Sequence, residues 1–164
     1  MEIHMKPKDL ARAVILVAVA VALSPFFIPV GISKCFPAQH MVNVIGAVML
    51  GPWYAVAIAF AAAVIRNITG LGTLLAFPGG MIGAFLAGLF YRFTKNTYAA
   101  GVGEVIGTGL LGALASVWIV GPVFMGRQMA VATLVIAFSI STLGGTIIGL
   151  GALHLLRKAK VWQP

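Results

Sequence analysis

Acidic residues are almost absent from this chain of 164 residues. Asp and Glu together number 3, against 11 Lys and Arg, and charged residues make up only 9% of the sequence. Because 61% of the residues are hydrophobic, a water-soluble fold would have too few polar groups to cover its surface. The composition predicts an all-α integral membrane protein, in which residues 1–164 form a single transmembrane domain in contact with lipid.

The motifs of several enzyme classes are also missing. The sequence has no G-x-x-x-x-G-K-[ST] phosphate loop, no H-E-x-x-H or paired-cysteine metal pattern, and no G-x-S-x-G nucleophile motif. One cysteine cannot form an internal disulfide. No series of carboxylates crosses the apolar runs, as it usually does in ion-coupled carriers. We therefore expect no catalytic residue, no metal and no cofactor, and energy for uphill transport would have to come from a partner.

The basic residues are explained by membrane topology. A formal net charge of +8 would suit nucleic-acid binding in a soluble domain, but here most basic residues cluster in short segments between apolar runs. We expect no nucleic-acid partner. Lys6, Lys8 and Arg12 precede an apolar run as in a secretory signal, yet further apolar runs follow and favour an uncleaved first helix. Met5 is an alternative start to Met1.

The apolar runs predict a bundle of six transmembrane helices. The first covers Leu10–Val30, and Pro25 and Pro29 should kink or end it near its far side. The second and third are short, each about 20 Å long as a helix, and meet at Gly51-Pro52 as two helices or as one interrupted span. The spans after the first are Ala38–Leu50, Trp53–Ile65, Phe77–Tyr91, Tyr98–Val120 and Met129–Leu156.

The distribution of basic residues favours six spans over five. With six spans and the N-terminus inside, eight basic residues face the cytoplasm and three face outside; five spans give five against six. The positive-inside rule therefore predicts a multi-pass protein of the cell membrane with both termini cytoplasmic, residues 1–9 and 157–164 being the tails. The eight are Lys6, Lys8, Arg12, Arg92, Lys95, Arg157, Lys158 and Lys160, and the three are Lys34, Arg66 and Arg127.

The stretch Ser24–Trp53 is the most polar part of the apolar chain. Non-helical backbone at membrane depth is tolerated only where it is buried in protein or lines a cavity. The outer connections are also longer or more irregular than the inner turns, and the second and third helices stop short on the outer side. We therefore expect an outward-facing hollow, bordered by the connections Ile32–Pro37, Asn67–Ala76 and Gly121–Gln128.

Three polar residues within the helices are candidate ligand contacts. His40 and Asn43 are three residues apart, so they share one face of the second helix and together offer donors and acceptors. Their alternative role is to cap the start of their own helix. Glu104 lies within the fifth span, where a carboxylate needs a partner, water or a proton. It is either a hydrogen-bond acceptor for the ligand or one half of a structural pair.

Further candidates lie toward the outer side. Arg66 and Asn67 end the third helix; Asn67 should face the hollow, whereas a cation at a helix C-terminus is favourable in itself. Lys34, together with Arg127, could attract an anion or simply be solvated in a loop. Trp118 could stack on a ligand ring or anchor the helix at the membrane interface.

Small residues spaced by four recur in several spans. Without bulky side chains, helix backbones approach closely, which is how helices associate in lipid. We expect most of these positions to pack inside the bundle: Gly79, Gly83, Ala87; Gly80, Ala84, Gly88; Gly103, Gly107; Gly145, Gly149; and Ala18, Ala22.

Several sequence runs resemble those of a known family. The runs SPFFIPVG (24–31), KCFPAQHMVNV (34–44), LGPWYAV (50–56), RNITGLGTLLAFPGGMIGA (66–84) and GEVIGTG (103–109) resemble the ThiW group of substrate-binding S components of energy-coupling factor (ECF) transporters. The resemblance implies the six-helix S-component fold and uptake of a thiamin precursor, hydroxyethylthiazole. It also implies a coupling transmembrane subunit, which docks on the step Ala18-x-x-x-Ala22, and two cytoplasmic ATPases.

Other functions remain open from the sequence. An S component could take another vitamin or an anionic, phosphorylated ligand. An integral membrane enzyme could use His40 and Glu104 as acid and base, although we expect these residues near opposite faces of the membrane, which argues against it. A channel or structural membrane subunit without a small-molecule site is the third possibility.

Overall fold

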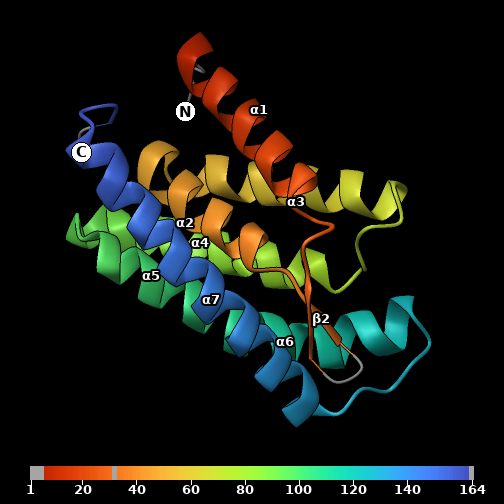
Figure 1. The fold of residues 1–164 in the computed structure, drawn as a ribbon. Coiled ribbons are helices and arrows are strands. Elements are labelled where there is room, and N and C mark those ends of the chain that lie inside the picture. Colours follow the sequence, from red (N-terminus) through yellow and green to blue (C-terminus); the bar gives the residue numbers. More distant parts are fainter. Residues whose placement is uncertain (1–5, 31–32, 163–164) are drawn as a thin grey trace.

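Helices form where the apolar runs lie, because a backbone in lipid must satisfy its hydrogen bonds within its own segment. The computed structural model describes residues 6–30 and 33–162 (Figure 1). The alternative starts Met1 and Met5 lie outside these residues, as do parts of both predicted tails. The elements are α1 (Pro7–Ala22), β1 (Ile28–Val30), β2 (Ser33–Cys35), α2 (Pro37–Leu50), α3 (Pro52–Ile68), α4 (Ala76–Thr94), α5 (Thr97–Ile106), η1 (Gly107–Gly112), α6 (Ala113–Ala115), η2 (Ser116–Phe124) and α7 (Val131–Lys158).

The helices agree with the prediction of an all-α membrane protein. α5, η1, α6 and η2 join into one helix, Thr97–Phe124, so the described chain has six helical segments. Three of them are long and apolar enough to cross a membrane, namely Ala76–Thr94, Thr97–Phe124 and Val131–Lys158, and Pro52–Ile68 is a shorter apolar helix. From the second segment onward, the predicted boundaries agree with the observed ones within four residues.

The prediction for the first helix was wrong at its C-terminal end. α1 stops at Ala22 instead of continuing to Val30, and the chain turns before β1. Pro25 follows within one turn, and a proline inside a helix removes a hydrogen bond and clashes with the preceding turn. β1 then pairs antiparallel with β2, with Ile28 opposite Cys35, so the chain also contains a short hairpin that the all-α prediction omitted.

α2 and α3 are two separate helices, as the first of the two sequence alternatives has it. Gly51 joins them with φ = 91°, a conformation that glycine adopts at little cost, and Pro52 begins α3. The two helices then pack against each other, since a Cβ on Gly46 of α2 would lie 3.2 Å from Cδ1 of Ile58 on α3. The short helices therefore form a helical hairpin.

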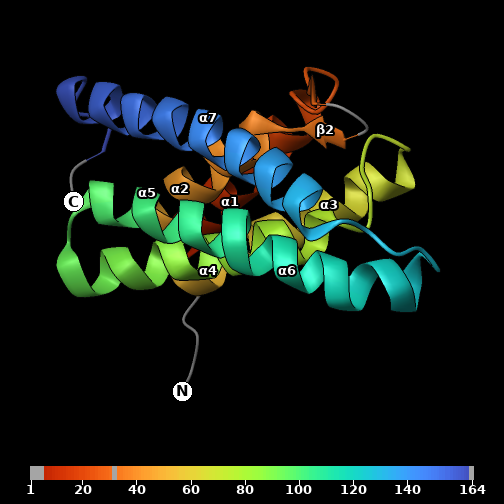
Figure 2. The same cartoon turned by 90° about the horizontal axis from the view of Figure 1, so that it is seen from below.

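α2 is the central helix of the bundle. It contacts α1, α3, α4, α5 and α7, and most of its residues are buried. The other helices surround it at an angle, as the two perpendicular views show (Figures 1 and 2). Any polar side chain on α2 must consequently find a partner inside the protein.

Glycine faces allow this close packing. A Cβ on Gly103 would lie 2.6 Å from the Leu86 carbonyl oxygen on α4, and a Cβ on Gly107 would lie 2.7 Å from Cα of Gly83. On α7, a Cβ on Gly145 would lie 2.6 Å from Cβ of His40. The glycine spacings therefore serve helix packing, as predicted.

The two ends of the bundle differ. One end, which we call the turn end, carries the tight connections at Gly51 and at Lys95–Asn96 and the C-terminus of α7. The other end, which we call the loop end, carries the β1–β2 hairpin and the connections 69–75 and 125–130. These connections project on the opposite side of the bundle from the 94–97 turn (Figure 2). Arg66 and Arg127 belong to the loop end.

The packing of α4 against α5 gives a test. Replacing Gly103 with Ala places a Cβ against backbone of α4, and overpacking of this kind costs about 1–3 kcal/mol. We expect the thermal midpoint of the purified protein in detergent to fall by several degrees. Gly151→Ala on α7 is the matched control, because nothing lies within 4 Å of its Cβ position, and its midpoint should stay the same or rise. Equal midpoints for the two variants would contradict the α4–α5 contact.

Candidate ligand-binding site

A cavity of about 470 Å³ opens at the loop end. Its volume lies in the range of roughly 300–1,000 Å³ that is typical of small-molecule pockets. Walls come from the start of α2, the end of α3, the start of α4, η1 and the first turns of α7, together with the connections 69–75 and 125–130. Among the residues that line it are Phe36, Gln39, His40, Arg66, Thr108, Arg127, Phe138 and Ser141.

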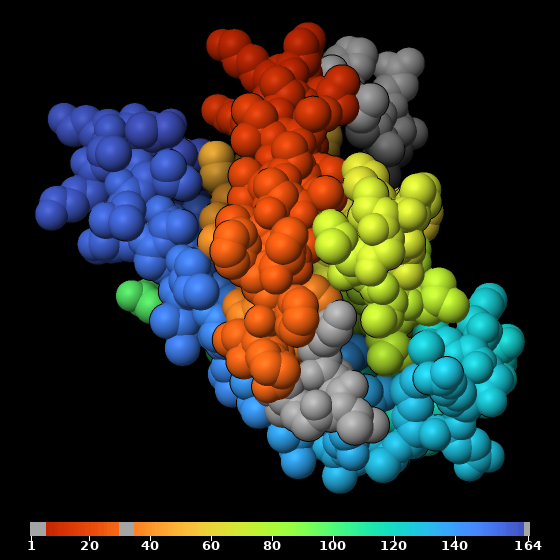
Figure 3. All heavy atoms as spheres, turned by 45° about the vertical axis from the view of Figure 1, so that its right-hand side comes forward, coloured from red at the N-terminus to blue at the C-terminus, as the bar shows by residue number. Residues whose placement is uncertain are grey.

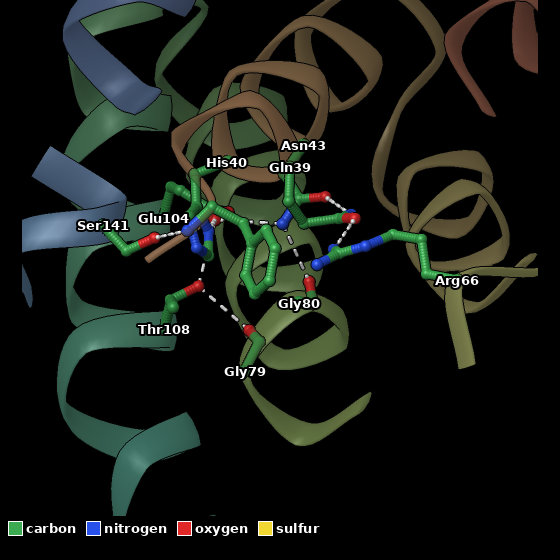
Figure 4. Close-up of polar contacts among 10 residues, drawn as sticks. Gln39, His40, Asn43, Arg66, Gly79, Gly80, Glu104, Thr108 and Ser141 are labelled. Atoms are coloured by element: carbon green, nitrogen blue, oxygen red, sulfur yellow. Dashed lines mark hydrogen bonds and ion pairs between the residues drawn. The ribbon is translucent and has the colours of Figure 1, made fainter. Parts of the chain in front are cut away.

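Glu104 lies behind the inner wall of this cavity. Its side chain is fully buried and is not part of the lining. Oε1 accepts hydrogen bonds from Nδ1 of His40 at 2.8 Å, from Nδ2 of Asn43 at 3.0 Å and from Oγ1 of Thr108 at 3.0 Å (Figure 4). Glycine at position 83 leaves room for the carboxylate, since a Cβ there would lie 2.7 Å from Oε2. Donors from three side chains thus converge on Oε1, whereas Oε2 has no hydrogen-bond partner among the described residues.

A chain of side-chain hydrogen bonds connects this carboxylate to Arg66. Nη1 of Arg66 donates to Oε1 of Gln39 at 3.1 Å. Nε2 of Gln39 donates to Oδ1 of Asn43, also at 3.1 Å, and Asn43 in turn donates to Glu104 and to the carbonyl oxygen of Gly80. Figure 4 shows these side chains pointing toward one another between α2, α3, α4 and α5. We call Gln39, His40, Asn43, Arg66, Glu104 and Thr108 the polar cluster.

Arg66 is a buried cation with spare donors. Its side chain is 1% exposed, and its Nε and Nη2 have no hydrogen-bond partner among the described residues. The guanidinium carbon lies 4.1 Å from the centroid of the Phe36 ring, a cation–π contact. Buried donors without a partner are costly, so this end of the cavity favours a ligand that brings an acceptor.

Four sequence candidates come together in the polar cluster, whereas Asn67 and Trp118 do not. His40, Asn43, Glu104 and Arg66 are connected through Gln39. Asn67 donates to the carbonyl oxygens of Ala63 and Thr73, so it fastens the 69–75 connection and does not line the cavity, contrary to the expectation that it faces the hollow. Trp118 is 66% exposed and also lies outside the cavity. The Lys34 side chain lies outside the described part of the structure.

The expected separation of His40 and Glu104 was wrong. Their side chains are 2.8 Å apart, although the sequence placed them near opposite faces. α2 begins inside the bundle beneath the hairpin, so His40 on its first turn lies as deep as Glu104 on α5. Glu104 is shielded from the cavity, and only His40 of the pair can touch a ligand there.

Gln39 and Thr108 are site residues that the sequence did not single out as candidate ligand contacts. Gln39 lies in the polar stretch before His40 and bridges Arg66 to Asn43. Thr108 lies in η1, and its single hydroxyl proton is within hydrogen-bond distance of both the Gly79 carbonyl oxygen and Oε1 of Glu104. Its position one turn after Glu104 was the available signal, because residues four apart share a helix face. The π-helical turn of η1 itself has no such signature.

A second hollow, apolar and away from the polar cluster, runs between α1 and α3. It has a volume of about 820 Å³, and both Ala18 and Ala22 are exposed in it. Figure 3 shows α1, in red and orange, as a ridge beside the yellow-green residues at and after the end of α3. These two alanines are the exception to the internal packing expected of the small-residue steps. The groove is lined by Leu10, Ala13, Val14, Val17, Ala18, Val21, Ala22, Trp53, Tyr54, Ala57, Ile58, Ala61 and Ile65.

Comparison with protein families gives one match that spans most of the chain. The model described as "Thiamine-precursor transporter protein (ThiW)" matches residues 10–159, which includes the polar cluster and both hollows. Comparisons with curated proteins and with solved structures found no match.

Cys35 offers a test of how the hairpin covers this site. Its side chain is 1% exposed, and Sγ donates to the Ala137 carbonyl oxygen at 3.1 Å. Burial raises the pKa of the Cys35 thiol, and only the thiolate reacts. We expect maleimide labelling of the folded protein to be many-fold slower than labelling in SDS, and to accelerate only at a higher pH than an exposed thiol requires. Rapid labelling at neutral pH would contradict the docked position of β2 against α7.

Proposed function

Because the chain belongs to the ThiW family of thiamine-precursor transporter proteins, we propose that it is the substrate-binding S component of an ECF-type importer and captures hydroxyethylthiazole. The observation that carries the proposal is the cavity at the loop end, with the polar cluster in its inner wall. The protein binds and moves the ligand without chemical change. Its sequence has no phosphate-binding loop, so ATP hydrolysis belongs to partner subunits.

The charge distribution supports a cavity that opens to the outside. The turn end carries the basic residues at the end of α4 and at the end of α7, whereas the loop end carries Arg66, Arg127 and Lys34. α1, which carries Lys8 and Arg12 in its first half, begins on the side of the bundle where α7 ends (Figure 1). By the positive-inside rule the turn end and both termini are cytoplasmic, and the six helical segments are six spans. Substrate then enters from outside between the hairpin and the two loop-end connections.

The dimensions and chemistry of the cavity fit a small heteroaromatic alcohol. Hydroxyethylthiazole has a flat ring with one nitrogen acceptor, and a hydroxyl group that can donate or accept. Phe36 and Phe138 offer aromatic surface in the lining. His40 and Arg66, which both line the cavity, offer polar atoms. A mostly apolar slot with a few oriented polar groups is the usual form of a small-molecule site.

One observation favours a second ligand class. Arg66 and Arg127 both line the cavity, and the acid nearest to it, Glu104, already accepts three hydrogen bonds. A phosphorylated thiazole would bring oxygens to these guanidinium groups. The two candidates share the thiazole ring and differ in charge, so one titration separates them.

Titration calorimetry of the purified chain in detergent tests the ligand. We expect saturable binding of hydroxyethylthiazole, at least about tenfold tighter than that of thiamin, because thiamin carries a fixed positive charge toward Arg66 and a second ring. The ligand should be recovered unchanged. Tighter binding of thiazole phosphate, lost in Arg66→Leu, would favour the second candidate. Binding of none of the three by folded protein would contradict the proposed function.

The groove between α1 and α3 is proposed as the docking surface for the coupling transmembrane subunit. Ala18 and Ala22 lie exposed in it, and small side chains permit close approach of a partner helix. Its lining is almost entirely apolar, which suits a partner within the membrane. Two cytoplasmic ATPases then act through that subunit.

Bulky residues in this groove should separate transport from binding. Ala18→Trp with Ala22→Trp should abolish uptake of radiolabelled hydroxyethylthiazole in cells that contain the coupling subunit and ATPases, because the partner helix no longer fits. Affinity of the isolated protein should stay within about twofold, since the groove and the cavity are separate. The matched control is Val102→Trp with Ile106→Trp, an exposed pair of the same spacing on α5, which should retain uptake. Loss of affinity in the alanine variant would show that this face packs inside the bundle.

A further inference from the structure

The hydrogen bonds that connect Arg66 to Glu104 all have their donor on the Arg66 side and their acceptor on the Glu104 side. Arg66 can only donate, and the Glu104 carboxylate can only accept. The two amides between them, Gln39 and Asn43, therefore have only one orientation that satisfies both ends, oxygen toward Arg66 and N–H toward Glu104. The orientation of each donor in this wall is thus set by its two charged ends.

Because a carboxylate can only accept hydrogen bonds, Glu104 also determines the tautomer of His40. Because Oε1 of Glu104 only accepts, the proton of a neutral His40 ring lies on Nδ1, 2.8 Å from that oxygen. The lone pair of the ring is then on Nε2. This arrangement, a carboxylate that orients one ring nitrogen so that the other can bind a ligand, is also how carboxylates orient histidines at metal sites.

Nε2 is the ring nitrogen left for a ligand. His40 lines the cavity, and the part of the chain that the structure describes contains no hydrogen-bond partner for its Nε2. The carboxylate itself cannot be reached, since Glu104 is fully buried and Gly83 lies close to its Oε2. The inner wall thus presents an acceptor at His40 and a donor at Arg66.

We propose that Glu104 is a positioning residue, which holds His40 so that Nε2 accepts a hydrogen bond from the hydroxyl group of the ligand. The inference rests on the proposed function, and adds that the site selects an alcohol by its O–H donor. The ring nitrogen of the ligand, an acceptor, is left for the Arg66 end of the cavity. An analogue without the hydroxyl proton leaves Nε2 desolvated and unpaired, and sites built in this way reject such analogues.

The test compares hydroxyethylthiazole with its 2-fluoroethyl analogue, which is close to it in size but cannot donate. We expect the wild-type protein to bind the alcohol about 10- to 100-fold tighter, measured as a ratio of dissociation constants by calorimetry. In Glu104→Leu the ratio should fall to near one, because nothing holds the proton on Nδ1. In Glu104→Gln the amide oxygen still accepts from Nδ1, so most of the ratio should remain.

Thr108→Val is the matched control. It removes one of the other donors to Oε1 and leaves the His40–Glu104 contact in place. The affinities of this variant for the two ligands should fall by the same factor, so that the ratio of their dissociation constants is preserved. A wild-type ratio near one, or a ratio that survives in Glu104→Leu, would overturn the inference while leaving thiazole binding intact. Failure of the wild type to bind either ligand would instead contradict the proposed function.

A measurement on the wild-type protein avoids any folding defect of Glu104→Leu. In ¹⁵N-histidine NMR spectra, assigned with His4→Gln and His154→Gln variants, Nε2 of His40 should have the shift of an unprotonated nitrogen, both free and with hydroxyethylthiazole. A protonated Nε2 in the bound state would overturn the inference, because that nitrogen would then donate to the ligand.

Discussion

The buried carboxylate of Glu104 is the interaction on which the centre of this bundle depends. A charge at membrane depth costs several kcal/mol unless it is paired and hydrogen-bonded. Here α2 supplies two donors, His40 and Asn43, and η1 supplies Thr108. Asn43 also donates to the Gly80 carbonyl oxygen of α4, and the Thr108 hydroxyl is within hydrogen-bond distance of the Gly79 carbonyl oxygen. The hydrogen bonds around Glu104 thus join α2, α4 and the helix Thr97–Phe124, in a setting where hydrophobicity alone gives little reason for helices to associate.

The position of the cavity follows from the helix that carries these donors. α2 is only 14 residues long and begins inside the bundle. The space on the loop-end side of its first turn is therefore bordered by the connecting loops and the hairpin, and this space is the cavity. Cys35 and Phe36 hold the end of the hairpin against α7, through Ala137 and Ser141. The lining of this space combines aromatic rings with oriented polar atoms, which is the usual form of a small-molecule site.

Much of the fold could be predicted from the sequence, because the apolar runs and the Gly51-Pro52 break act locally. The first helix was predicted too long because its hydrophobicity was given more weight than Pro25. The hairpin of β1 and β2 was not predicted, because three-residue strands are too short to show an alternating pattern. The glycine spacings predicted close packing, but not which helix each would meet.

The candidate site was only partly predictable. Glu104 was identified because a carboxylate in an apolar helix needs a partner, His40 and Asn43 because they share a helix face, and Arg66 because it ends the third helix on the outer side. Their pairing was not, since it depends on how deep α2 begins and how the helices tilt, and residue counting along separate spans does not give either quantity. Gln39 has a role only because Arg66 and Asn43 lie on opposite sides of it, which three-dimensional proximity alone reveals.

The most direct test of this account is an experimental structure of the protein with hydroxyethylthiazole bound. The account predicts the ligand in the loop-end cavity, with its hydroxyl oxygen within hydrogen-bond distance of Nε2 of His40, and with Glu104 still bonded to Nδ1 and not in contact with the ligand. A ligand bound elsewhere, or one that contacts Glu104 directly after His40 has moved away, would contradict it.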